Sequence, residues 1–342
     1  MDIRVGFIGT GGIAYEHARA LAGVGRLRLT AACDNNPERL RNFLAAFPGP
    51  RACADYRDLL ASDQLDAVFI LLPHHLHEPA AIDALRAGKH VLLDKPIART
   101  LAEADRILAV AQSSPAVFMV GHNERYWPVY QYIRQIIERG DLGPIFAARA
   151  DHHQNPNFPR DSWWRSAELV GGGCVMGSGI HRLDLLRWYL GEVDEVFARA
   201  VSDPRRGEAE IACVASLRFG SGAIADFFCN WAAPAPPPLL QYRGEGMSLF
   251  GRDGALYLAD RTSVWIKRAQ REAELIALEG LPDQATLMYE HFADCIERGE
   301  PPLTGGAEAR AALEVVEAIY ESLRTQQPVK LQSKSQNLKS KI

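Results

Sequence analysis

Short apolar runs and longer amphipathic segments alternate along the first 121 residues of the chain. The apolar runs have the length and composition of buried strands, whereas the amphipathic segments repeat their apolar positions with the period of a helix. The predicted strands cover residues 3–9, 27–34, 66–72, 90–94 and 116–121, and the predicted helices cover 13–22, 37–46, 76–87 and 101–112. Strands that alternate with helices build a parallel sheet, so residues 1–121 are predicted to form a doubly wound α/β domain.

The pattern of apolar runs changes after Gly121. Turn signals such as Gly220-Ser221-Gly222 and Asp253-Gly254 separate successive apolar runs, which favours antiparallel hairpins. The predicted strands cover 144–152, 193–201, 211–219, 223–230, 247–250 and 255–258, and the predicted helices cover 129–139, 180–189, 284–298 and 307–324. Residues 122–331 are therefore expected to form a second, α+β domain. The polar residues 332–342 are expected to form a flexible tail, and Pro234 to Pro238 a proline-rich loop.

Composition narrows the class of protein. With 47% hydrophobic residues the chain can build ordinary cores, and its net charge of −4 argues against a nucleic-acid partner. Its apolar runs are far shorter than the roughly 18 to 20 residues of a membrane span, and the start of the sequence lacks the pattern of a secretory signal, so a cytoplasmic protein is expected. The six cysteines form no C-x-x-C pair, so neither structural zinc nor a disulfide framework is expected.

A glycine-rich loop, Gly9-Thr10-Gly11-Gly12-Ile13-Ala14, follows the first predicted strand and opens the first predicted helix. Such a loop turns tightly and brings its backbone N–H groups to a pyrophosphate at the helix N-terminus. Asp34 ends the next apolar run 22 positions after Gly12, at the offset of a ribose-binding acid, and Asn35 follows it. Because a carboxylate there repels a 2′-phosphate, NAD is favoured over NADP, although Arg39 keeps NADP open. The alternative is a glycine turn with an incidental helix-capping aspartate.

Two longer motifs carry a family resemblance. Residues 87–96 (AGKHVLLDKP) are similar to the A-G-K-H-V-L-x-E-K-P segment of the glucose-fructose oxidoreductase, inositol dehydrogenase and MocA family, and residues 171–184 are similar to its G-G-G-x-x-x-D-x-G-x-H-x-x-D segment. The resemblance runs almost end to end and implies a Rossmann domain followed by a large, open, mostly antiparallel sheet. It also implies a nicotinamide-dependent oxidoreductase. Two residues depart from the motifs: Asp94 replaces a glutamate, and Gly177 replaces the first aspartate.

The chemistry of alcohol oxidation needs a base and a cation beside the developing alkoxide. Lys95 lies at the carboxyl end of its predicted strand and is assigned as that cation, the alternative being a surface lysine before a proline. His181 is assigned to proton exchange, because its unperturbed pKa lies near 6.5. Asp184, three residues later on the same helix face, either orients the His181 imidazole or pairs with Arg187.

The resemblance adds further ligand-binding residues. His153 matches an H-x-N segment that inositol dehydrogenases present to substrate, and Asn123 and Arg125 are expected to line the same cleft. Trp164 and Arg165 match a W-R pair near the nicotinamide or substrate, although tryptophans in a loop are equally common as core plugs. The family's cofactor-contacting loops correspond to Pro73, His74, His77 and Asp94. His74, His75 and His77 also invite a metal interpretation, but the sequence offers no further ligands, so no metal is expected.

Three functions remain open at this stage. The first is an NAD-dependent dehydrogenase of a cyclic polyol, a sugar or a sugar derivative. The second is a redox-neutral enzyme that recycles tightly bound NAD, and the third is a non-catalytic NAD or sugar sensor, which Gly177 makes more credible.

Gly177 and the second domain suggest two further hypotheses. Gly177 either opens volume for a bulky substrate, accommodates a substrate with its own acid group, or marks lost activity. The open sheet predicts a homodimer or homotetramer, with Val214, Phe227 and Cys229 among the residues that face the partner.

Overall fold

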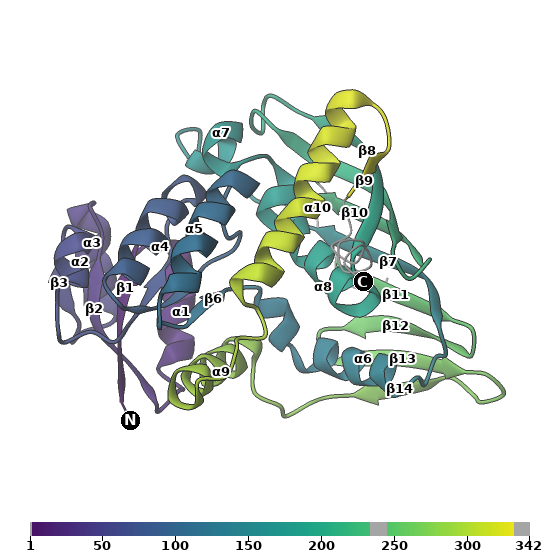
Figure 1. The fold of residues 1–342 in the computed structure, drawn as a ribbon, viewed down its shortest axis with the longest axis horizontal. Coiled ribbons are helices and arrows are strands. Elements are labelled where there is room, and N and C mark those ends of the chain that lie inside the picture. The colour runs from purple at the N-terminus through teal and green to yellow at the C-terminus, as the bar shows by residue number, and fades with distance from the viewer. Residues whose placement is uncertain (1, 233–244, 332–342) are drawn as a thin grey trace, which may run out of the picture. The chain divides into compact units, whose positions relative to one another are not determined.

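The computed structural model describes residues 2–232 and 245–331, so the expected proline-rich loop at 234–238 and the expected tail at 332–342 lie outside the described residues. The chain divides into two compact units (Figure 1). Unit 1 comprises residues 1–126 and 282–310, and unit 2 comprises residues 127–281 and 311–342. Across the described part of the chain, none of the helices combines the length and hydrophobicity that crossing a bilayer requires.

Unit 1 is a doubly wound α/β unit, as the sequence predicts. Its six parallel strands lie in the order β3-β2-β1-β4-β5-β6, so the strand order reverses between β1 and β4. Ligands bind at the carboxyl ends of the strands at such a reversal. The strands are β1 (Ile3–Ile8), β2 (Leu27–Cys33), β3 (Arg51–Cys53), β4 (Ala67–Ile70), β5 (His90–Leu93) and β6 (Phe118–Val120). The helices are α1 (Gly12–Leu21), α2 (Pro37–Ala46), α3 (Tyr56–Leu60), α4 (His77–Arg86) and α5 (Leu101–Ser113), with the 3-10 turns η1 (His74–Leu76) and η2 (Asn123–Tyr126).

A helix from the C-terminal part of the sequence completes the core of unit 1. Helix α9 (Gln284–Arg298) contributes Tyr289 and Phe292, whose rings lie 5.2 and 5.8 Å from the ring of Phe69 on β4. Phe69 in turn stacks on Phe7 of β1 at 5.5 Å. The structural division therefore differs from the expected boundary at residue 122, which assigned all later residues to one domain. Long-range aromatic packing is the reason, and the local pattern of α9 carries no sign of it.

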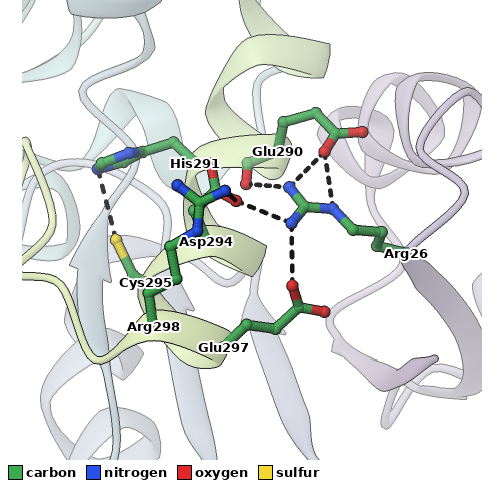
Figure 2. Close-up of polar contacts among 7 residues, drawn as sticks. All are labelled: Arg26, Glu290, His291, Asp294, Cys295, Glu297 and Arg298. Atoms are coloured by element: carbon green, nitrogen blue, oxygen red, sulfur yellow. Dashed lines mark hydrogen bonds and ion pairs between the residues drawn. The ribbon is translucent and has the colours of Figure 1, made fainter. Parts of the chain in front are cut away.

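Arg26 fixes α9 to unit 1 from the surface. Its guanidinium donates to Glu290 at 2.5 Å, to Asp294 at 2.8 Å and to Glu297 at 3.1 Å, three acids on successive turns of α9 (Figure 2). These contacts raise the pKa of Arg26 and lower that of Asp294. The arginine stands immediately before β2, so the first half of the sheet is tied to a helix more than 250 positions later.

Unit 2 is built on a nine-stranded sheet, in the order β14-β13-β12-β11-β7-β10-β9-β8-β15. The hairpins predicted around Gly220 and Gly254 are present, but β7 and β10 pair in parallel, so the sheet is mixed. The strands are β7 (Ile145–His153), β8 (Val193–Ser202), β9 (Glu210–Phe219), β10 (Ile224–Asn230), β11 (Glu245–Gly251), β12 (Gly254–Asp260), β13 (Ser263–Arg268), β14 (Glu274–Ala277) and β15 (Val329–Lys330). The helices are α6 (Pro128–Glu138), α7 (Ala167–Val170) and α8 (Ile180–Leu190), with the 3-10 turn η3 (Trp163–Arg165), the π turn η4 (Val175–Gly179) and most of α10 (Gly306–Thr325).

The two faces of this sheet differ. One face packs against α8 and the π turn and buries apolar side chains such as Ala150, Phe227 and Leu249. We call the opposite face the outer face. It carries Val201, Val214, Ile224, Tyr257, Trp265 and Leu275, each between 40% and 63% exposed. Of the three residues expected to face a partner, Val214 lies on the outer face. Phe227 and Cys229 were assigned wrongly, because the strand register turns them toward the π turn, where Phe227 and Cys229 contact Gly179.

Candidate functional site

The glycine loop of unit 1 leaves space at the N-terminus of α1. Gly9 has a φ of +99°, and a Cβ there would lie 2.4 Å from the Leu71 carbonyl oxygen, so only glycine fits. A Cβ on Gly11 or Gly12 would meet no atom within 4 Å, so these two positions border open space. Open space above the first N–H groups of a helix suits a pyrophosphate. These residues, with Ile13 after them, fit the dinucleotide-binding role that the sequence predicts.

Asp34 lies directly after β2 and binds this loop. One carboxylate oxygen accepts hydrogen bonds from the Thr10 backbone N–H and the Thr10 hydroxyl, both at 2.9 Å, and the other accepts from the Asn36 N–H at 2.9 Å. The acid therefore has a fixed position beside the glycine loop. Asn35, the remaining residue of the predicted ribose site, is exposed next to it.

Lys95 follows β5 in a segment that His77 holds in place. Burial lowers the pKa of the Lys95 ammonium, while the carboxylates of Asp94 and Glu124 act in the opposite direction. The two ring nitrogens of His77 lie 2.8 Å from the Pro96 carbonyl oxygen and 2.8 Å from the Leu72 carbonyl oxygen. The His77 ring thus joins the chain after β4, which continues into Pro73, to the chain around Lys95.

The histidine cluster has a structural explanation. His77 is fully buried with both nitrogens on backbone carbonyls, and the His74 ring lies 5.5 Å from it. Within residues 2–232 and 245–331, no group of three or more His, Cys, Asp or Glu side chains is placed to hold a metal ion. The six cysteines are buried thiols without a disulfide among them.

Asn123 and Arg125 follow β6 on the 3-10 turn η2. Asn123 lines a cleft in unit 1 together with Ile13, His17 and Tyr289. Arg125 is buried, and its guanidinium donates to the Leu303 carbonyl at 3.2 Å and to the Glu308 carboxylate at 3.1 Å. These bonds hold the chain that enters α10. Arg125 therefore has a structural role, and the substrate contact stays a prediction.

In unit 2, His181 lies on the first turn of α8, close to His152. The two imidazole centroids are 6.4 Å apart. Asp184 is buried three residues after His181, and Arg187 forms two hydrogen bonds with Glu192, at 3.0 and 2.6 Å. Arg187 therefore has a carboxylate partner besides any contact with Asp184.

Strand alternation separates His152 from His153. His152 lies on the helix-covered face of β7, as Ala148 and Ala150 do, whereas His153 lies on the outer face. There the His153 ring contacts Phe228, with centroids 4.9 Å apart, and one ring nitrogen contacts the Asn230 amide. Sequence reasoning chose His153 from its motif and missed His152. The period of two along β7 was the signal that could have found it.

Gly177 faces an aromatic cluster, which we define as Phe158, Trp163, Trp164 and Trp231. A Cβ on Gly177 would lie 2.3 Å from the Trp231 indole and 3.0 Å from that of Trp164. Trp231 is held there because its indole N–H donates to the Ser178 hydroxyl at 2.7 Å, and that hydroxyl donates to Gln154 at 2.8 Å. The hypothesis that Gly177 opens volume for a bulky substrate is therefore wrong in this structure, since the Trp231 ring fills the space.

The tryptophans pack closely with their neighbours. The ring of Trp164 stacks on Phe158 at 5.4 Å and on Trp163 at 4.2 Å, and it meets Trp231 edge-on at 5.9 Å. Trp163 and Trp164 remain partly exposed. The Arg165 guanidinium donates to the Arg205 carbonyl at 2.6 Å.

Comparison with known proteins gives the family. An oxidoreductase family with an NAD-binding Rossmann fold matches residues 3–122, and the GFO/IDH/MocA C-terminal domain matches residues 130–257. A myo-inositol 2-dehydrogenase of Thermotoga maritima is 26% identical over 341 residues, which cover 96% of this chain and 99% of that protein. A levoglucosan dehydrogenase of Pseudarthrobacter phenanthrenivorans is 29% identical over 209 residues, 58% of this chain and 53% of that protein.

The fold comparison agrees over nearly the whole chain. The crystal structure of an aldose-aldose oxidoreductase from Caulobacter crescentus, complexed with glycerol, has a TM-score of 0.88 at 25% identity and covers 97% of this chain and 100% of its own. Family models and structural similarity confirm the resemblance that the motifs at residues 87–96 and 171–184 indicate. The chain therefore belongs to the glucose-fructose oxidoreductase, inositol dehydrogenase and MocA family of oxidoreductases, which bind NAD on a Rossmann fold.

Proposed function

We propose that this protein is a dehydrogenase that oxidises a secondary alcohol of a cyclic polyol, a sugar or a sugar derivative with NAD. The observation that carries the proposal is Lys95, a lysine with a lowered pKa that follows the carboxyl end of β5, in a unit that matches an NAD-binding Rossmann fold. When bound, NAD supplies a hydride acceptor. The products are a ketone, NADH and one proton, which the protein must receive.

Lys95 and His181 have different roles in this proposal, charge stabilisation and proton acceptance. The Lys95 ammonium donates a hydrogen bond to that oxygen and stabilises its negative charge as the hydride leaves carbon. His181 accepts the hydroxyl proton, because a neutral imidazole is available near neutral pH. Asp34 selects NAD, since its carboxylate would face a 2′-phosphate with like charge.

The aromatic cluster supports a ring-shaped polyol as the substrate. Indole faces pack against the apolar face of a sugar ring and leave its hydroxyl rim to polar groups, and Trp164 is partly exposed for such a contact. The names of the relatives agree with this class, because they include an inositol dehydrogenase and a levoglucosan dehydrogenase.

The test is a screen of inositols, aldoses, anhydrosugars, sugar acids and glycosides for the appearance of NADH absorbance. In Lys95→Met, turnover of the best substrate should fall at least about a thousandfold, with NAD affinity within about threefold of the parent. Lys89→Met is the matched control. Lys89 stands just before β5 and donates to the backbone carbonyls of Ser62 and Leu65, so its loss should leave kcat unchanged. Near-normal turnover of Lys95→Met would remove Lys95 from the mechanism.

A second candidate is a redox-neutral reaction with recycled NAD. The similarity to an aldose-aldose oxidoreductase favours it, because that name describes oxidation of one sugar and reduction of another. Nucleotide absorbance that persists in the purified protein, together with turnover of a sugar pair without net NADH, distinguishes it from the first candidate.

We also propose that the protein works as a homodimer or homotetramer in the cytoplasm. The exposed apolar side chains of the outer face would cost free energy in water unless another subunit covered them. The cytoplasm provides the free NAD that the reaction needs and keeps thiols such as the six buried cysteines reduced.

A further inference from the structure

The helical segment that carries His181 begins without a local cap. It starts as the π turn η4 and continues as α8, and its N-cap residue, Cys174, makes no side-chain capping bond. The first intrahelical bond of the turn runs from the Gly177 N–H to the Gly173 carbonyl at 2.9 Å. The N–H groups before it need partners from elsewhere, because a helix N-terminus leaves its first donors unsatisfied.

Two side chains from distant elements, the buried Glu210 and the partly buried Tyr320, supply those partners. One oxygen of the Glu210 carboxylate, at the start of β9, accepts from the Gly173 N–H at 3.2 Å and from the Val175 N–H at 3.0 Å. The hydroxyl of Tyr320, on α10, accepts from the Gly173 and Met176 N–H groups, both at 3.2 Å. The same hydroxyl donates to Glu210 at 3.0 Å, which joins the two side chains into one acceptor group.

We propose that Glu210 and Tyr320 are positioning residues of the dehydrogenase. They form a tertiary cap that fixes the start of the His181 helix and thereby the place of the imidazole. This inference rests on the proposed function, in which His181 receives the substrate proton. Neither residue belongs to the motifs that predicted the site.

The glycines before the helix follow from this cap. Gly172 has a φ of +144°, and a Cβ on it would lie 1.9 Å from the Tyr320 hydroxyl oxygen. A Cβ on Gly173 would lie 2.1 Å from the Glu210 carbonyl and 2.8 Å from its carboxylate. Gly172 and Gly173 therefore allow the cap to approach the backbone, which ties a sequence motif to two side chains far from it.

The charge of Glu210 suits this place. A carboxylate at a helix N-terminus interacts favourably with the partial positive charge of the aligned N–H groups. Burial raises the pKa of Glu210, and its hydrogen bonds from Val175, Tyr320 and Gly173 oppose that shift. Burial, together with the Glu210 charge, raises the pKa of the Tyr320 hydroxyl, so Tyr320 stays protonated and keeps donating to the acid.

The test compares Tyr320→Phe with Tyr189→Phe in the full-length protein. Tyr189 is a buried tyrosine at the other end of α8, and its hydroxyl donates to the Tyr130 carbonyl at 2.9 Å. Each variant removes one hydrogen-bonded hydroxyl, but only the first touches the cap. We expect amide hydrogen exchange at Gly173 and Met176 to become about tenfold faster in Tyr320→Phe and to stay unchanged in Tyr189→Phe. Glu210→Gln, which keeps an acceptor oxygen but loses the charge, should accelerate exchange at Val175 by a smaller factor.

Two further measurements separate positioning from mere stability. In Tyr320→Phe, kcat should fall about tenfold with the NAD affinity within twofold of the parent, and the imidazole NMR signals of His181, assigned with His181→Asn, should shift. Unchanged exchange in Tyr320→Phe would refute the cap. Faster exchange with unmoved His181 signals would refute its positioning role. If no polyol reduces NAD in the parent protein, the proposed function fails, while exchange and the His181 signals still decide the inference.

Discussion

The Asp34 carboxylate holds the glycine loop and is proposed to select the cofactor. It holds the glycine loop through Thr10 and stands where a ribose-binding acid is expected, so its loss would affect both loop geometry and cofactor choice. A substitution that keeps a side-chain oxygen separates the two. Asparagine removes the charge and keeps one acceptor oxygen for Thr10, while its amide nitrogen can no longer accept from the Asn36 N–H.

For Asp34→Asn we expect the ratio of NADP affinity to NAD affinity to rise about tenfold, because like charge no longer opposes the 2′-phosphate. Calorimetric titration of both cofactors measures the ratio. Asp283→Asn is the control. Asp283 caps α9 in the same unit through the Ala285 and Thr286 N–H groups, so this variant should leave the ratio unchanged. An unchanged ratio in Asp34→Asn would show that another residue selects the cofactor.

The close packing beside Gly177 can be tested by substitution. Gly177→Asp drives a Cβ and a carboxylate into the Trp231 indole, which its bond to Ser178 holds in place. Overpacking of this kind costs about 1 to 3 kcal/mol, and burial of the new charge adds to it, so the melting temperature and the activity should both fall. If the indole causes the clash, Gly177→Asp should cost less stability in the Trp231→Ala background than in the parent protein. A Gly177→Asp variant with unchanged stability would show that the indole moves aside.

At the scale of elements, a helix distant in sequence completes the Rossmann unit. Helix α9 brings Tyr289 and Phe292 into the core, and Arg26 holds its exposed side through three acids (Figure 2). Arg26 and its partners are each 28% to 40% exposed, so solvent screens the individual pairs. The network is more stabilising than three separate pairs, because the conformational entropy of one arginine side chain is lost once for three contacts.

Arg26→Ala should lower the free energy of unfolding by about 1 kcal/mol, or roughly 3 °C in melting temperature. Because Arg26 lowers the pKa of Asp294, the difference from the parent should be full above the ordinary aspartate pKa, near 3.9, and shrink as the pH falls below it. Thermal unfolding across that range measures it. Arg106→Ala is the control. Arg106 pairs with Glu78 at the surface, so its loss should change the free energy of unfolding little.

The elements that the sequence predicts best are those with local signals. Helices α2 and α9 begin and end where expected, because Asn36 and Asp283 cap them and their apolar stripes are regular. Strands β13 and β14 were missed. Strand β14 lies at the sheet edge and has no buried residue, and β13 beside it mixes exposed with buried positions. The remaining differences arise from contacts between distant residues. The local sequence around Gly177 does not reveal that Trp231, 54 positions later, fills the space beside it, nor that Glu210 and Tyr320 approach Gly173.

At the scale of the whole molecule, the outer face is the surface that argues for assembly. Val214, Tyr257 and Trp265 stand on it among charged side chains such as Arg149 and Asp226, a mixture that suits an interface with a second copy.

Trp265→Glu should weaken a dimer or tetramer, because it places a charge where an apolar side chain would be buried. Light scattering at micromolar concentration should then report a smaller mass for the variant than for the parent. Leu281→Glu, a change of the same kind at an exposed position outside the strands, should leave the mass unchanged. A parent protein with the mass of one chain would contradict the oligomer itself.

The discontinuous make-up of unit 1 has a consequence for synthesis of the chain on the ribosome. Its two parts are separated by the 155 residues from 127 to 281. At about 5 to 20 residues per second, the nascent parallel sheet waits roughly ten to thirty seconds for α9. During that interval Phe69 lacks Tyr289 and Phe292, so the emerging domain exposes an apolar surface that a chaperone can bind. Completion of the NAD-binding unit is therefore expected late in translation, although most of its residues are made first.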